Sequence, residues 1–587
     1  MRAGWSFGRS CFSEAGRLRQ QTPSAAGSVS PHPPAGPGAG RRFVQAAIIA
    51  LVSLLALTQA GCTGVRREVP REASLAWSTP GDTALGRGLA RPLAAGCSHP
   101  DPAGPFNAAA ICPSGFHMLT QGIDALRIRA ELADAARHTL DLQYYTLHED
   151  TTTSLLLWRI LRAAGRGVRV RLLLDDLYAA GRDVDLAVLD AHPLIEVRVF
   201  NPFLQRGGFG LSRLLEFLGD PARLNRRMHN KLWIADNAAA VVGGRNLGDV
   251  YFEAHPGVNF SDLDLLASGP VVAQLSASFD EYWNSDWAVP ITAFVANDPG
   301  TGVLPAFQAR LEAEVQGFRD TPYGAALREA RILPRLLDGR LALAQAPALA
   351  FYDKPDKVSA TATVDDSANA NPVFQTHLKP AIQAARGEVL LVSPYFIPSE
   401  QGMDAMAALV KRGVRVRVLT NSLAATDVPA VHAGYAQVRE RLLAAGVEIH
   451  EMRPEASAAG RIRLPALPGA SSATSLHAKA ILVDRQRLFA GSMNLDPRSR
   501  LPNTEVGVML ESRELGAQLG ALFDQAMQPA HSFRLALEAD PQMPGSTQLV
   551  WHAEADGRPV RYNEEPASLW LRLLSKLLGF VAPADLL

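Results

Sequence analysis

The chain has 587 residues, more than one ordinary hydrophobic core accommodates, so two or more domains are expected. Hydrophobic residues make up 47% of it and charged residues 20%, a balance typical of globular proteins and not of disordered ones. The 58 basic and 58 acidic residues leave no formal net charge, which argues against a nucleic acid as the main partner.

The first 62 residues are typical of an export leader. Ser, Pro, Gly and Ala dominate the first forty, and two arginines then precede an apolar run over 43–57 that ends in small residues. The sequence Ala60-Gly61-Cys62 resembles the processing site of bacterial lipoproteins, although Gln59 stands where leucine is usual. An uncleaved anchor helix over 43–61 is the alternative. We therefore expect a protein of the bacterial cell envelope that is exported, lipidated at Cys62 and held at the membrane facing the periplasm.

Residues 63–112 are rich in Pro, Gly and Ala and are expected to form a tether between the membrane and the first domain. The chain has four cysteines, and removal of the leader and lipidation of Cys62 leave Cys97 and Cys112. In an exported protein such a pair most simply forms one disulfide, and two free thiols are the alternative.

From about residue 114 the apolar spacing alternates between helical and strand periods, which predicts a first domain over 113–300. Helices are expected over 122–137, 154–164 and 271–283. Strands are expected over 139–147, 168–175, 195–200, 231–235, 239–242 and 263–267. This order is typical of an α/β sandwich.

The same order returns later in the chain. Gly167–Leu173 (GVRVRLL) is echoed by Gly413–Leu419 (GVRVRVL) at an offset of 246 positions, and a strand at 388–393 and a helix at 403–411 follow the first-half pattern. The sequence therefore predicts an α/β fold of two homologous sandwich domains, related by a pseudo-twofold axis, with mixed sheets flanked by helices. A connecting segment is expected over 301–345, the second domain over 346–540 and a tail over 541–587.

The tail contains a strongly apolar stretch, Ser568–Phe580, with one Trp and two cations. Such an amphipathic helix fits a membrane interface, and it fits equally well a helix that docks on the domain surface.

The pattern His-x-Lys-x-x-x-x-Asp occurs twice, 248 positions apart: His229, Lys231 and Asp236, then His477, Lys479 and Asp484. Each copy is followed by a turn of small residues that ends in Asn246 or Asn494, and the second turn contains Ser492. Residues two apart on a strand share a face, so each His and Lys should point together. The Asp, seven positions from its His, lies on the opposite face and is expected to be structural.

These residue types suit chemistry at phosphorus. An imidazole can attack or carry a proton near neutral pH, and a lysine supplies a compact positive charge. The chain has only seven lysines, and its other basic residues are arginines, yet both motifs contain a lysine. One half cannot flank a phosphorus atom on two opposite sides, but two halves related by a pseudo-twofold axis can.

The double motif resembles the phospholipase D superfamily. Four segments resemble, more narrowly, the bacterial cardiolipin synthases of the C type, and the likeness runs from about residue 114 to the C-terminus: Arg223–His229, Val242–Asp249, Asn421–Leu423 and Val431–Tyr435. The resemblance implies phosphatidyl transfer that forms cardiolipin from phosphatidylglycerol and a second phospholipid, with phosphatidylethanolamine as a possible donor, at a membrane. A hydrolytic phospholipase D and an exported nuclease of the same superfamily are the alternatives.

The resemblance also implies a role for each motif residue. His229 is expected to be the nucleophile, which forms a phosphohistidine, and His477 the acid and base, with the reverse order still open. Negative charge on the phosphate oxygens would be stabilised by the cations and polar groups of both motifs: Lys231, Lys479, Asn246, Asn494 and Ser492. The cations are built in and the sequence has no Cys/His ligand cluster, so neither a metal nor a cofactor is expected.

An imidazole in either role needs a partner on its other nitrogen. One carboxylate downstream of each motif fits this need: Asp262 follows His229 by 33 positions, and Glu505 follows His477 by 28. Asp264 is the alternative in the first half.

Overall fold

The computed structural model describes residues 69–90, 97, 106, 108, 110–179, 182–204, 216–295, 300, 302–359, 374–454 and 473–581, all within one compact unit. The expected leader and Cys62 lie outside these residues. Among the described helices, none combines the length and the apolar character that crossing a bilayer requires.

The first half is built on a nine-stranded sheet with the order β10-β1-β8-β6-β5-β2-β3-β4-β9. β2, β3 and β4 run parallel and the other pairs antiparallel, so the sheet is mixed as predicted. Its strands are β1 (Ser114–Leu119), β2 (Thr139–Tyr144), β3 (Arg169–Asp175), β4 (Ile195–Phe200), β5 (Leu232–Ala235), β6 (Ala239–Gly243), β8 (Asp264–Ser268), β9 (Ala288–Pro290) and β10 (Ala344–Ala346).

The second half repeats this arrangement in a ten-stranded sheet with the order β11-β18-β17-β16-β12-β13-β14-β19-β20-β21. β12, β13 and β14 form the parallel part, as β2, β3 and β4 do in the first half. Its strands are β11 (Ala348–Tyr352), β12 (Glu388–Val392), β13 (Arg415–Asn421), β14 (Glu448–Met452), β16 (Ala480–Val483), β17 (Arg487–Gly491), β18 (Val506–Glu511), β19 (Ser532–Ala539), β20 (Thr547–Ala555) and β21 (Arg558–Tyr562). The matching strand orders confirm the predicted duplication.

Helices cover both sheets. The first half has α3 (Gly122–Ala135), α4 (Thr151–Gly165), α5 (Asp176–Ala179), α6 (Asp183–Asp190), α8 (Pro221–Leu224) and α9 (Pro270–Trp283). The connecting segment forms α10 (Val303–Arg319), α11 (Pro322–Glu329) and α12 (Leu333–Leu337). The second half has α13 (Lys379–Gln383), α14 (Glu400–Lys411), α15 (Pro429–Ala436), α16 (Arg439–Ala444), α17 (Pro497–Arg500), α18 (Arg513–Ala526) and α19 (Leu569–Val581).

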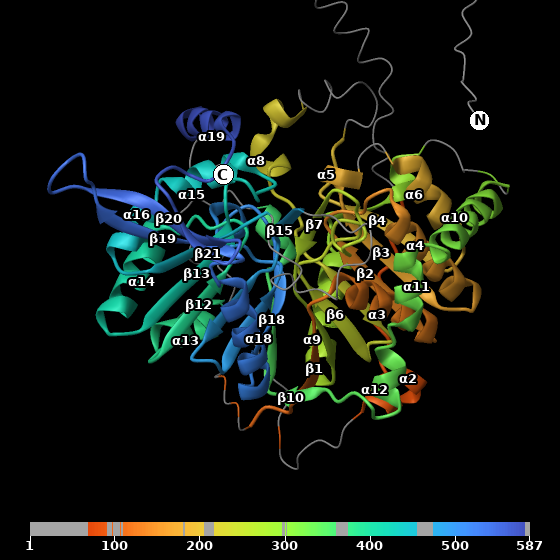
Figure 1. The fold of residues 1–587 in the computed structure, drawn as a ribbon. Coiled ribbons are helices and arrows are strands. Elements are labelled where there is room, and N and C mark those ends of the chain that lie inside the picture. The colour runs from red at the N-terminus through yellow and green to blue at the C-terminus, as the bar shows by residue number, and fades with distance from the viewer. Residues whose placement is uncertain are drawn as a thin grey trace, which may run out of the picture. The chain divides into compact units, whose positions relative to one another are not determined.

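The two sheets share one central apolar core. That core contains residues of β5, β6 and β8 together with residues of β12, β16 and β18, and it includes α9 and α18. The outer face of each sheet has a core of its own, under α3 and α4 in the first half and under α14 and α15 in the second. Figure 1 shows the first half in orange to yellow-green beside the second half in green to blue. Because the strands are buried on both faces, the halves are fixed against one another by ordinary core packing.

A two-stranded parallel sheet also joins the halves. β7 (Val258–Ser261) of the first half pairs with β15 (Ala473–Leu476) of the second. Met228 makes a matching isolated bridge to Thr504. Each histidine motif therefore starts where a strand of its own half meets the other half.

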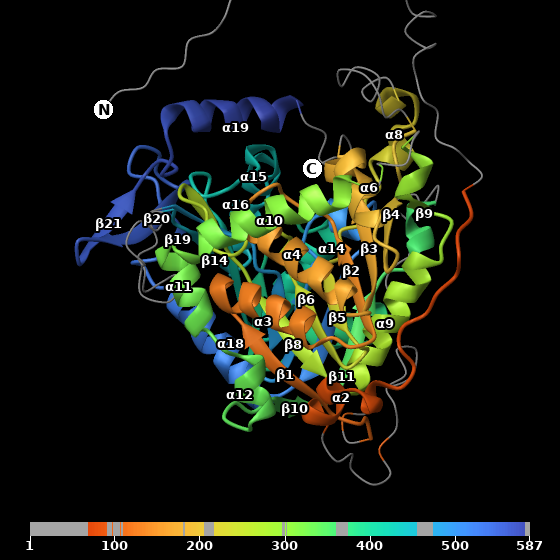
Figure 2. The same cartoon turned by 90° about the vertical axis from the view of Figure 1, so that its right-hand side faces the viewer.

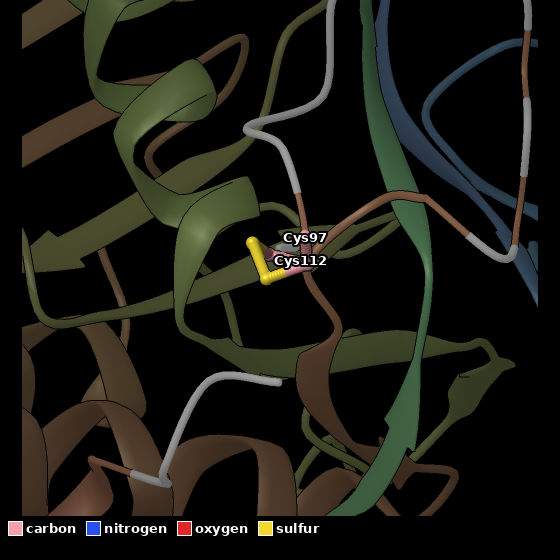
Figure 3. The surroundings of a disulfide bond; sticks show 2 residues. All are labelled: Cys97 and Cys112. Atoms are coloured by element: carbon pink, nitrogen blue, oxygen red, sulfur yellow. A yellow bond between two sulfur atoms is a disulfide. The ribbon is translucent and has the colours of Figure 1, made fainter. Parts of the chain in front are cut away.

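Two segments fold beyond their expected bounds. Part of the expected tether packs on the first half: it forms α2 (Ala84–Leu89), buries Leu85 and Leu89, and stacks Trp77 on His138. Within it, Cys97 and Cys112 form the predicted disulfide (Figure 3). In the second half β20 and β21 extend the sheet past residue 540, where the tail was expected to begin.

Candidate active site

The residue before each motif histidine is held by a polar side chain at the end of a parallel strand. Asp175, the last residue of β3, accepts a hydrogen bond of 2.8 Å from the Met228 amide. Asn421, the last residue of β13, accepts one of 2.8 Å from the Leu476 amide and donates one of 2.9 Å to the Leu476 carbonyl. Asp175 and Asn421 are 246 positions apart, the offset of the internal repeat. Asn421 lies in one of the segments that resemble the cardiolipin synthases, and the repeat offset marks Asp175 as its counterpart in the first half.

Each imidazole is bound by a carboxylate of the other half. His229 Nδ1 lies 3.0 Å from Glu505 Oε2, and the His229 amide donates to the Thr504 carbonyl at 2.9 Å. His477 Nδ1 lies 2.6 Å from Asp262 Oδ2, and its amide donates to the Ser261 carbonyl at 2.8 Å. Both predicted carboxylates therefore contact a histidine, but each contacts the histidine of the opposite motif.

The alternative carboxylate, Asp264, lies elsewhere. Its Oδ2 forms a buried ion pair of 2.9 Å with Arg129 Nη2, and its Oδ1 accepts from the Arg245 amide at 3.2 Å. Asp264 thus stabilises the interior of the first half.

The two motif lysines are buried beside their histidines. Lys231 Nζ donates to the His229 carbonyl at 2.6 Å. Lys479 Nζ lies 2.9 Å from His477 Nδ1 and also donates to the His477 carbonyl. Burial lowers the pKa of Lys231 well below its ordinary value and that of Lys479 to about 8. Burial thus disfavours the charged form of both lysines, and nearby carboxylates, Glu505 for Lys231 and Asp262 for Lys479, act in the opposite direction.

Both imidazoles have a lowered pKa, and the effect is larger for His229. Burial lowers the pKa of His229 well below its ordinary value, and the charges of Lys231, Lys479 and His477 lower it further. Burial and Lys479 lower the pKa of His477, while Asp262 acts in the opposite direction. Groups of the second motif thus act on the histidine of the first, as expected when both motifs share one site.

The two carboxylates differ more strongly. Burial raises the pKa of Glu505 to about 7, against the effects of Lys231 and of the Ser492 and Ser499 hydroxyls. Burial would also raise the pKa of Asp262, but His477 and Lys479 outweigh it, so this pKa lies below its ordinary value.

Comparison with known proteins assigns the family. A family described as "Cardiolipin synthase, PLD-like domain" matches residues 129–283 and 378–527, and each range contains one histidine motif. The chain belongs to this family. "Cardiolipin synthase C" of Escherichia coli (strain K12) is 37% identical over 471 residues, which cover 80% of this chain and 95% of that protein. An "Uncharacterized protein" of Helicobacter pylori (strain 26695) is 29% identical over 521 residues, covering 88% and 95%. The crystal structure of a phosphatidylserine synthase of Haemophilus influenzae has a TM-score of 0.48 and 14% identity, covering 75% and 93%.

In this phospholipase D-like fold the motif aspartates contact backbone and not the histidines. Asp236 accepts from the amides of three successive residues, Arg137 to Thr139, at 2.8–3.2 Å. Asp484 accepts from the amides of Arg386 to Glu388 at 2.7–3.3 Å. Both aspartates have a positive φ, 52° and 50°, which places them in the turn after the motif strand. Each therefore ties its motif strand, β5 or β16, to the start of the neighbouring antiparallel strand, β2 or β12.

The three polar side chains expected to contact phosphate, Asn246, Asn494 and Ser492, differ in how far their hydrogen bonds are already made within the protein. The Asn246 side chain donates to the Tyr251 hydroxyl at 3.0 Å and accepts from the Thr146 amide at 3.2 Å. Asn494 Oδ1 is buried and accepts no hydrogen bond from the described residues. Ser492 donates its hydroxyl proton to Glu505 and accepts from the Val506 amide. The Ser492 hydroxyl therefore donates its hydrogen bond to a buried carboxylate of the protein and not to a phosphate.

Aromatic rings surround both imidazoles, and these the sequence analysis missed. Tyr145 packs edge-on against His229, with ring centroids 5.0 Å apart. Tyr251 and Phe260 pack against His477, at 5.3 and 4.8 Å. No repeat or motif marks these positions. The rings help to bury both imidazoles, which are 8% and 5% exposed.

A cavity of about 580 Å³ lies between α4, α6 and α10, and no motif residue lines it. His148 lines it, and the His148 ring contacts Tyr251, which in turn contacts His477. Its volume lies in the range of small-molecule sites.

One further cluster has metal-binding geometry among the described residues: His432, Glu451 and Glu565. Arg439 Nη1 already lies 2.7 Å from Glu565 and 3.3 Å from Glu451, and Trp551 donates to Glu451 at 2.9 Å. Because Arg439 pairs with both carboxylates and His432 pairs with Glu565, the cluster is an internal ion-pair network.

Proposed function

We propose that this protein is a phosphatidyltransferase that forms cardiolipin from phosphatidylglycerol and a second phospholipid, with phosphatidylethanolamine as a donor. The proposal is carried by one observation: two imidazoles, each with Nδ1 on a carboxylate of the opposite half, stand beside two buried lysines in one site. The 37% identity to a cardiolipin synthase over most of both chains supports it.

His229 is the proposed nucleophile. An attacking imidazole must be neutral, and burial keeps the pKa of His229 well below its ordinary value. An ionised Glu505 can only accept a hydrogen bond, so in that state Nδ1 carries the proton toward Glu505 and Nε2 carries the lone pair. Nε2 attacks the phosphorus of the donor lipid, the bond from phosphorus to the headgroup oxygen breaks, and a phosphatidyl-histidine forms.

His477 is the proposed acid and base. Its Nε2 gives a proton to the departing headgroup oxygen, while Asp262 stabilises the imidazolium before this transfer. In the second step the hydroxyl of phosphatidylglycerol attacks phosphorus, its proton passes to His477, and the bond from phosphorus to His229 breaks. Lys231, Lys479 and the two motif asparagines stabilise the charge on the phosphate oxygens.

We also propose that the protein is exported and lipid-anchored at Cys62 in the cell envelope. The leader pattern and the Cys97–Cys112 disulfide support this, because structural disulfides persist in oxidising compartments. The intact mass of the mature protein is expected to match a chain that begins at lipidated Cys62, and Cys62→Ala should not give this product. An unprocessed N-terminus would contradict the proposal.

The central test is incubation of the purified protein with phosphatidylglycerol vesicles, with and without phosphatidylethanolamine, followed by mass spectrometry of the lipids. Cardiolipin, with ethanolamine released when the second lipid is present, is the expected result. His229→Ala and His477→Ala should give no product, whereas His552→Ala, a half-exposed histidine on β20, should behave as wild type. Phosphatidic acid alone would indicate hydrolysis, and cleavage of DNA without lipid turnover would indicate a nuclease.

A further inference from the structure

Helix α19 exposes a continuous apolar face to solvent. Its exposed large side chains are Leu569, Trp570, Leu573, Leu577 and Phe580, which are 54–91% exposed. At 100° per residue these five positions fall within one stripe about a quarter of the helix circumference wide. We call this stripe the α19 face. The other side of the helix is docked: Ser575 is buried, and the Gln437 side chain donates to the Gly579 carbonyl at 3.2 Å.

The first half carries a second exposed apolar surface. Leu177 on α5, Leu204 after β4, and Phe217 and Leu218 before α8 are 37–66% exposed. We call these four residues the α5–α8 patch. Isolated exposed leucines need no explanation, but a group of them close to one functional site does.

The α5–α8 patch is fastened to the segment that carries His229. The Leu177 amide donates to Asp175, the carboxylate that also holds Met228. Glu216 accepts from the Leu204 amide at 2.8 Å and pairs with Arg223 at 3.0 Å. The patch thus lies within a few hydrogen bonds of the first motif.

The α19 face is fastened in the same way to the second motif. α19 packs on α15, and His432 of α15 lies 2.7 Å from Glu565, shortly before α19. Just before α15, Asp427 accepts from the Tyr395 hydroxyl at 2.8 Å, and its charge raises the pKa of both His477 and Lys479. Figure 1 shows α19, α15, α8 and α5 at the same end of the two sheets, near β15 and β7, and Figure 2 shows α19, α15 and α8 at that end.

We infer that the α19 face and the α5–α8 patch dock the active-site end of the protein onto the surface of a lipid bilayer, one surface on each side of the site. The inference rests on the proposed function, because a lipid substrate has to leave a bilayer next to the histidines. Trp570 is suited to the boundary between acyl chains and headgroups, and Lys576 adds positive charge beside the face, whereas Arg572 is paired with Glu564. A bilayer fits both surfaces at once. A protein partner that covered both would also cover the way to the site.

The test compares charged variants on two substrates. Trp570→Glu combined with Leu577→Glu, and separately Leu218→Glu, should lower turnover on vesicles of phosphatidylglycerol and phosphatidylcholine at least about tenfold, since each inserted apolar side chain contributes to binding. Turnover of monomeric dihexanoyl phosphatidylglycerol should stay within about twofold of wild type, because the chemistry is untouched. Met543→Glu, in the turn between β19 and β20 and 61% exposed, is the matched control and should be silent on both substrates. Equal loss on both substrates, or no loss on vesicles, would overturn the inference.

A second readout does not depend on turnover. The fluorescence of Trp570 is the difference between the fluorescence of wild type and that of Trp570→Phe, and brominated lipids should quench it. This quenching reports contact of α19 itself with the bilayer, even when the chain is anchored through Cys62. Absence of quenching together with concentration-dependent dimerisation would assign the α19 face to a second copy. If wild type turns over neither lipid but Trp570 is quenched, the proposed function fails while the docking surface stands.

Discussion

The two halves of the molecule deliver the same pair, an imidazole on a carboxylate, into different electrostatic surroundings. On the His477 side, Asp262 is 2.6 Å from the ring and has a pKa below its ordinary value, so it is ionised at neutral pH. On the His229 side, Glu505 is 3.0 Å away and burial raises its pKa to about 7, so it is divided between two protonation states. Duplication thus preserved the contact while the charge state diverged.

This difference matches a division of labour. A general acid must carry a proton before the reaction starts, and a fixed negative charge beside His477 favours that state. A nucleophile must be neutral, and His229 has a lowered pKa and, in Glu505, the weaker counter-charge. The asymmetry between the carboxylates therefore supports the order of roles that we propose.

The largest expected effect separates the two histidines directly. With a donor whose headgroup is a good leaving group, such as p-nitrophenol, His477→Gln should still release p-nitrophenol in a single burst, because this alcohol leaves without being protonated. The second step then lacks its base, so a phosphatidyl adduct on His229 should accumulate and be visible in the intact-protein mass. His229→Gln should show neither burst nor adduct, with turnover at least about 10⁴-fold below wild type. A burst in His229→Gln but not in His477→Gln would reverse the roles.

The next largest effect is a difference between the two carboxylates, Asp262 and Glu505, in how much turnover is lost when each is replaced by its amide. Asp262→Asn should lower kcat by about 10³-fold or more, because an amide stabilises the imidazolium poorly and can hold the wrong tautomer. Glu505→Gln should cost only about tenfold, because Glu505 is already partly neutral at pH 7 and Ser492 and Ser499 keep the side chain in place. Steady-state kinetics on phosphatidylglycerol vesicles measures both. Equal losses in the two variants would remove the electrostatic distinction between the halves.

Much of this fold could be predicted from the sequence, because its strands are buried on both faces and are rich in Val, Leu and Ile. The strand expected at 195–200 is β4 (Ile195–Phe200), and the one expected at 168–175 begins a single residue later, as β3. β7 (Val258–Ser261) was missed, because it is short and polar and owes its conformation to pairing with β15. Tertiary pairing of this kind leaves no local pattern.

The active site, like the fold, has residues that the sequence predicts and residues that it does not. The repeat and the motifs led to both histidines and to both carboxylates, since a carboxylate recurs at a similar distance downstream of each motif. Which histidine each carboxylate serves could not be read from those distances. The exchange between Asp262 and Glu505 follows from β7 and the Thr504 bridge, which carry each carboxylate across to the other half. Tyr145 and Phe260 were missed because packing against an imidazole imposes no spacing on the sequence.

The pH dependence of turnover should show the protonation of Glu505 directly. The enzyme works best with Glu505 ionised, so turnover should fall below pH about 7, where Glu505 binds a proton, and should level off about tenfold lower, the loss expected for Glu505→Gln. Lys479 is needed protonated, so turnover should fall again above about 8. The profile of kcat/KM is therefore expected to have its maximum between these values. Glu505→Gln should lose the acid limb and keep the alkaline one, and an unchanged acid limb would assign that limb to another group.

The smallest effect concerns the motif aspartates, which test structure and not chemistry. Asp236 is fully buried and Asp484 only partly so, yet each accepts hydrogen bonds from three successive backbone amides. Asp236→Asn should lower the free energy of unfolding by about 2 kcal/mol, since charge-assisted hydrogen bonds are lost in a dry site, and Asp484→Asn by about half as much. Urea denaturation measures both. Turnover per folded molecule should stay near wild type for the two variants, because neither side chain reaches the histidines. A loss of turnover without a loss of stability would instead place the aspartate in the reaction.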